Sequence, residues 1–102
     1  LLDECLPRAL KRRLGDHAVE TVPDAGWAGR TNGELLRLAA DAFDVFVTID
    51  QRLVEQQASI PSDLAVVVLA AVSNRMADLE PLIPQLTECI GLAVSGQVYR
   101  VA

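Results

Sequence analysis

The feature that most constrains the fold is an unbroken apolar run over residues 64–69, with the sequence Leu-Ala-Val-Val-Val-Leu. A strand that is buried on both faces shows such a run in place of alternating polar and apolar residues, and strands of this kind belong to parallel sheets that helices cover. We therefore expect residues 64–69 to form the central strand of the domain.

Other strand-like and helical segments alternate along the chain with this run. The further strand-like segments are residues 1–2, 17–22, 45–49 and 97–101. Helical spacing of apolar residues is found over 7–14, over 31–41 and over a segment that begins near Pro81 and Pro84, while 51–57 is a short helix or irregular. Such alternation predicts right-handed βαβ units. The expected fold is a three-layer α/β/α sandwich with a mostly parallel five-stranded sheet.

Length, charge and cysteine content limit the function classes. The chain has 102 residues, which suffices for one hydrophobic core, so 1–102 is expected to be a single domain. A net charge of −5 argues against broad electrostatic binding of nucleic acid, although acids clustered in a site contribute to this count. Without a membrane-length apolar run or a secretory signal, we expect a cytoplasmic protein with no membrane contact. Cys5 and Cys89 are expected to be reduced thiols.

Three acidic residues stand where the expected fold would gather them. Asp3 follows the first strand, Asp50 follows the strand at 45–49, and Glu34 lies in the first turn of the helix at 31–41. In open α/β sheets, ligands collect outside the carboxyl ends of the strands. Clustered carboxylate oxygens suit Mg²⁺ or Mn²⁺, which can activate water for phosphodiester cleavage. The sequence thus predicts a metal site at this edge.

Each of these acids also has a purely structural explanation. Asp3 could cap the helix that follows it, and Asp50 could cap the segment after the strand at 45–49. Glu34 completes a capping box with Thr31, three residues earlier. The joint placement of the three acids, more than any one of them, favours a functional site.

Five short segments follow one another in a distinctive order and spacing. They are 1–7 (Leu-Leu-Asp-Glu-Cys-Leu-Pro), 24–27 (Asp-Ala-Gly-Trp), 32–36 (Asn-Gly-Glu-Leu-Leu), 47–50 (Val-Thr-Ile-Asp) and 73–75 (Ser-Asn-Arg). Together they resemble the PIN-like proteins of the DUF5615 (Mut7-C-like) group, related to VapC-type toxin ribonucleases, over nearly the whole chain. The resemblance implies a metal-dependent endoribonuclease with Asp3, Glu34 and Asp50 as catalytic, metal-binding acids. It also implies an RNA substrate and a small antitoxin protein as partner.

The chain departs from the PIN pattern at the fourth acid, which PIN nucleases usually carry after their fourth strand. Ser73, Asn74 and Arg75 stand there instead, and an oxygen of Ser73 or Asn74 could hold a metal-bound water. Arg52 and Arg75 are expected to contact RNA phosphates, because arginine can bind a phosphate through two N–H groups. Ordinary surface salt bridges to nearby acids are the alternative for both arginines.

Two other functions remain open. A non-catalytic PIN-like interaction module would explain the missing acid. A receiver-like signalling domain would need a lysine after its last strand, whereas the only lysine is Lys11. Trp27 is expected to pack over the core or to lie in a contact with a partner or with a second copy of the chain, as in a homodimer. Stacking of Trp27 on a base is the other alternative.

Overall fold

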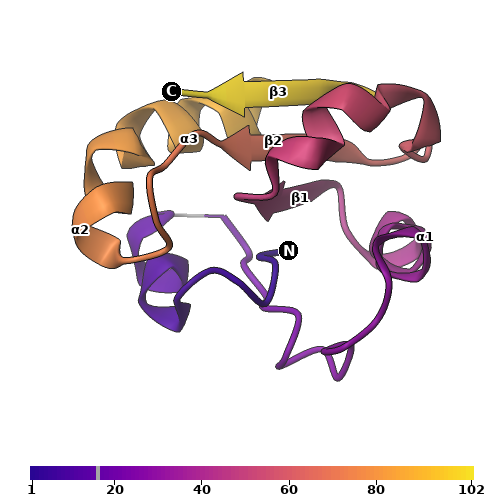
Figure 1. Ribbon diagram of the computed structural model, residues 1–102, viewed down its shortest axis with the longest axis horizontal. Helices are drawn as coiled ribbons and strands as arrows, with labels where there is room; N and C mark the ends of the chain where they lie inside the picture. Colours follow the sequence, from indigo (N-terminus) through magenta and orange to yellow (C-terminus); the bar gives the residue numbers. More distant parts are fainter. Residues whose placement is uncertain (16) are drawn as a thin grey trace.

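A parallel three-stranded sheet forms the middle of the molecule (Figure 1). The computed structural model describes residues 1–15 and 17–102, except for the side chains of residues 56–58. The strands are β1 (Val45–Thr48), β2 (Ala65–Leu69) and β3 (Val98–Val101), in the order β1-β2-β3. All five residues of β2 are buried, which confirms the central strand expected from the apolar run.

The first residues of the chain extend this sheet by single bridges. Leu2 forms parallel bridges with Val47 of β1 on one side and with Thr21 on the other. The amide of Asp3 donates a hydrogen bond to the carbonyl of Val47 (2.9 Å), and the amide of Leu2 donates one to the carbonyl of Glu20 (2.8 Å). The segment around Leu2 therefore lies beside β1, and the segment around Thr21 lies on the far side of Leu2.

The prediction of a five-stranded sheet is nevertheless wrong, because the described residues form three strands. The first segment turns directly after its bridge, where the amide of Leu6 binds the carbonyl of Asp3 (3.0 Å). The segment around Thr21 ends at Pro23, where a turn begins. In this turn the amide of Gly26 donates a hydrogen bond to the carbonyl of Pro23 (3.0 Å). Neither segment continues far enough for a regular ladder.

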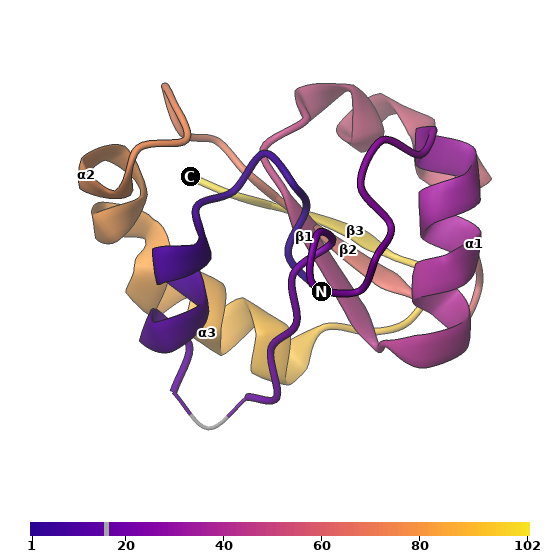
Figure 2. The same cartoon turned by 90° about the horizontal axis from the view of Figure 1, so that it is seen from below.

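Helices cover both faces of the sheet. They are η1 (Arg8–Arg13), α1 (Asn32–Ala42), η2 (Gln51–Ser59), α2 (Met76–Leu79), η3 (Glu80–Leu82) and α3 (Ile83–Leu92). Figure 2 shows α1 on one side of the sheet and α3, with the indigo helix η1, on the other. The predicted α/β/α layering is therefore confirmed. None of the described helices is long and apolar enough to cross a bilayer.

The alternating side chains of β2 divide the core into two clusters. Val66 and Val68 pack with residues of α1 and η2, whereas Val67 and Leu69 pack with residues of η1, α2 and α3. This division follows from the strand geometry, in which successive side chains point to opposite faces. Trp27 packs against the first cluster and meets the ring of Phe43 edge to face, with 5.9 Å between centroids, as expected for a residue that covers the core.

Local signals in the sequence explain most helix boundaries. The hydroxyl of Thr31 accepts a hydrogen bond from the amide of Glu34 (3.3 Å), so the predicted cap of α1 is confirmed. Pro81 and Pro84 lie in the first turns of η3 and α3, where a missing N–H costs little. The helix expected over 7–14 is instead the 3₁₀ helix η1, and Pro7 precedes it.

Candidate functional site

A buried hydroxyl at the end of β1 joins two of the three predicted acids. Thr48 is fully buried, and its hydroxyl donates a hydrogen bond to Oδ2 of Asp3 (2.7 Å). The hydroxyl oxygen of Thr48 also accepts a hydrogen bond from the backbone amide of Asp50 (3.0 Å). Asp3 and Asp50 thus lie at the same edge of the sheet, as predicted. Sequence analysis missed Thr48, although a polar residue that ends an apolar strand is a signal that could have indicated it.

The carboxylate of Asp3 is bound by neutral donors. Its Oδ1 accepts one hydrogen bond, from the backbone amide of Glu4 (2.8 Å). The thiol of Cys5 lies 3.5 Å from Oδ2, and burial raises the pKa of this thiol, which keeps it protonated. Asp3 forms no ion pair with any residue in the described part of the chain. Because each carboxylate oxygen can accept two hydrogen bonds, Asp3 keeps room for a further ligand.

The carboxylate of Asp50 is held by an arginine. Arg52 donates from Nε to Oδ1 (2.9 Å) and from Nη2 to Oδ2 (2.8 Å), and its backbone amide donates to Oδ1 (3.1 Å). Asn32 donates from its side-chain amide to Oδ2 (3.3 Å). The hydrogen bonds from the Arg52 side chain are the main reason that the pKa of Asp50 falls to about 2. Asp50 is therefore ionised at neutral pH, and all of its acceptor positions are used.

Glu34 does not join Asp3 and Asp50 in the structure. Its carboxylate is half exposed and lies 3.7 Å from the guanidinium of Arg30. Within residues 1–15 and 17–102, no three His, Cys, Asp or Glu side chains form a group that could hold a metal. Asn32 lies two residues earlier in α1, and a helix turns about 200° over two residues. Asn32 therefore reaches Asp50 while Glu34 faces another direction, and Glu34 as a metal ligand stays a prediction.

The turn that replaces the fourth acid lies against the first segment of the chain. Asn74 donates from its side-chain amide to the backbone carbonyl of Cys5 (2.9 Å), which brings it near Asp3. Arg75 lies 3.5 Å from Asp78, whose carboxylate also accepts a hydrogen bond from the hydroxyl of Ser73. Both predicted phosphate ligands, Arg52 and Arg75, thus form exposed ion pairs.

Gln51 joins the ends of β1 and β2 by hydrogen bonds, and sequence analysis did not identify this residue. Its side-chain amide donates to the carbonyl of Ile49 (3.1 Å) and to the carbonyl of Leu69 (2.7 Å). The ends of β1 and β2 are thereby tied together directly beside Asp50. The spacing in sequence gives no sign of this contact, because Leu69 is brought near only by the pairing of the two strands.

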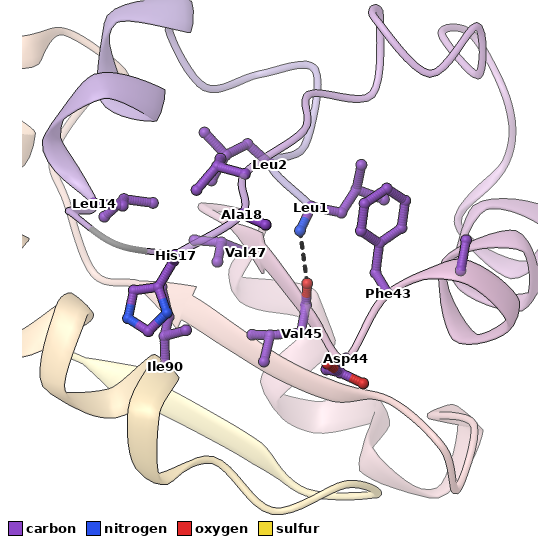
Figure 3. A pocket seen from close by; sticks show the side chains of 12 residues that line it. Leu1, Leu2, Leu14, His17, Ala18, Phe43, Asp44, Val45, Val47 and Ile90 are labelled. Atoms are coloured by element: carbon purple, nitrogen blue, oxygen red, sulfur yellow. Dashed lines mark hydrogen bonds between the residues drawn. The ribbon is translucent and has the colours of Figure 1, made fainter.

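A cavity lies at the other end of β1 (Figure 3). It has a volume of about 400 Å³, and most of its lining is apolar, with His17 and Asp44 as polar exceptions. The amino nitrogen of Leu1 donates a hydrogen bond to the carbonyl of Val45 at its wall (2.8 Å). None of the predicted site residues lines this cavity, so it is separate from the acidic edge.

Two carboxylates, those of Asp3 and Asp50, belong to residues at the acidic edge. Mg²⁺ in proteins is often held by one or two carboxylates, keeps several waters and contacts phosphate oxygens. Asp3 has one unused acceptor position, because Glu4, Cys5 and Thr48 use the other three. Asp50 becomes available only if Arg52 leaves it. Binding of Mg²⁺ or Mn²⁺ at this edge therefore stays a prediction.

Comparison of the chain with protein-family models, with curated proteins and with solved structures gives no match. The resemblance to PIN-like proteins consequently depends on the five sequence segments alone. The family assignment stays a prediction.

Proposed function

We propose that the protein is a metal-dependent endoribonuclease of PIN-like type that acts as the toxin of a toxin–antitoxin pair. The observation that supports this proposal most is the link from Asp3 through the buried hydroxyl of Thr48 to Asp50. The link joins the carboxylate of Asp3 to the backbone amide of Asp50, two acids distant in sequence, at the carboxyl edge of a parallel sheet, where α/β proteins bind their ligands.

In this proposal Asp3 and Asp50 hold Mg²⁺ or Mn²⁺, and Glu34, which does not join them in this structure, is the third predicted ligand. The bound cation would supply an activated water and would stabilise the leaving oxygen. Thr48 positions the carboxylate of Asp3 and the backbone of Asp50 through its hydrogen bonds. Asn74 places a neutral amide near the position of the missing fourth acid, which is consistent with a single cation.

The substrate would be RNA, bound through its phosphates. Arg52 and Arg75 have highly exposed side chains near this edge, and arginine can bind a phosphate through two parallel N–H groups. Asn74 would add a neutral donor. Because the net charge is −5, cations close to the site matter more for RNA binding.

The test is cleavage of single-stranded RNA by the purified protein with Mg²⁺, with Mn²⁺ and with a chelator. Asp3→Asn and Asp50→Asn should each reduce the cation-dependent rate by about 100-fold or more. Asp41→Asn, which changes an exposed acid on α1, is the matched control and should keep the rate. If the wild type, Asp3→Asn and Asp50→Asn all cleave RNA at the same rate, the activity comes from a contaminating ribonuclease and the proposal is refuted.

Glu34→Gln separates the two roles of Glu34. If Glu34 serves only the N-terminus of α1 and the ion pair with Arg30, the variant should cleave RNA as fast as the wild type. If Glu34 joins Asp3 and Asp50, the rate should fall as in the other two variants. A bacterial growth assay, with and without the neighbouring reading frame, tests the toxin role and the antitoxin partner.

A non-catalytic interaction module is the second candidate. The occupied carboxylate of Asp50 favours it, because Arg52 and Asn32 use every acceptor position that a cation would need. This candidate predicts neither RNA cleavage nor cation binding. The cleavage assay above therefore distinguishes the two.

A further inference from the structure

We draw no further inference here: the strongest candidate, the mostly apolar cavity at the start of β1 with His17 and Asp44 in its lining, carries nothing because nothing in the described part of the structure shows what fills it.

Discussion

Replacement of Thr48 by valine tests whether one buried hydroxyl holds the acidic edge together. Valine has nearly the shape of threonine and keeps the branched side chain that suits a strand, so the variant loses little except the hydroxyl. It removes the donor to Oδ2 of Asp3 (2.7 Å) and the acceptor for the amide of Asp50 (3.0 Å).

The expected loss of stability follows from these two contacts. A hydrogen bond to a charged group contributes about 1.5–3 kcal/mol and a neutral one about 1 kcal/mol. The carboxylate of Asp3 is only half-buried, so water replaces part of the lost bond. We therefore expect the free energy of unfolding of Thr48→Val to fall by about 2 kcal/mol, with a decrease in Tm of roughly 10 °C. Urea unfolding followed by circular dichroism measures the change.

Thr87→Val provides the matched control. The hydroxyl of Thr87 donates to the carbonyl of Ile83 one turn earlier in α3 (2.9 Å), at a half-buried position. Such a bond adds little to a helix, so this substitution should change the free energy of unfolding by no more than about 0.5 kcal/mol. If Thr48→Val and Thr87→Val differ by less than about 0.5 kcal/mol, the reasoning about Thr48 is refuted.

Two further measurements test the electrostatics and the core. Arg52→Met should raise the pKa of Asp50 from about 2 toward the ordinary value of 3.8, measured by carboxyl NMR. Because the folded-state pKa is the lower one, the stabilisation by this pair is present above about pH 4 and is lost as the pH falls through 2, and Arg52→Met should lack this loss. Leu86→Ala should lower the free energy of unfolding by about 2–5 kcal/mol, because Leu86 is fully buried in α3. Leu92→Ala, in the same helix at 71% exposure, should change it by less than about 0.5 kcal/mol; similar losses in both variants would contradict the described core.

The elements that the sequence predicts correctly are those with a strong local signal. The run at 64–69 leaves few alternatives to a strand buried on both faces, and β2 has that burial at every residue. Thr31 with Glu34 three residues later correctly predicts the start of α1. Pro81 and Pro84 restrict where the regular part of α3 can begin, because neither can donate a backbone hydrogen bond.

The sheet size was harder to predict, because it depends on pairing that side-chain patterns do not record. Leu2 belongs to an apolar segment that is typical of a strand. Only the structure shows that it forms a single bridge with Val47 and a single bridge with Thr21. The turn after Asp3 and the proline at position 23 end these pairings early. The residue types in both segments indicate strands. The number of residue pairs that each segment forms depends on how the chain packs in three dimensions.

The candidate site also contains contacts that the sequence predicts and contacts that depend on tertiary packing. Asp3 and Asp50 could be placed together because the carboxyl ends of neighbouring parallel segments meet at one edge. The contact of Asn32 with Asp50, where Glu34 was expected, depends on the rotation of α1 about its axis. The ion pair of Arg52 with Asp50 was indicated by their spacing only as one of two alternatives.

These contacts also separate what is local from what the fold must provide. Apart from Asn32, every described hydrogen bond to Asp50 comes from residues 48–53, so its position is set within one short segment. Asp3 is different, because it reaches Thr48 only while the first segment stays paired with β1 through Leu2. A change that weakens the pairing of Leu2 with Val47 should therefore displace Asp3 and leave Asp50 in place. The two-acid site is for this reason a property of the assembled sheet, whereas the ion pair of Asp50 with Arg52 is a property of the segment that carries both residues.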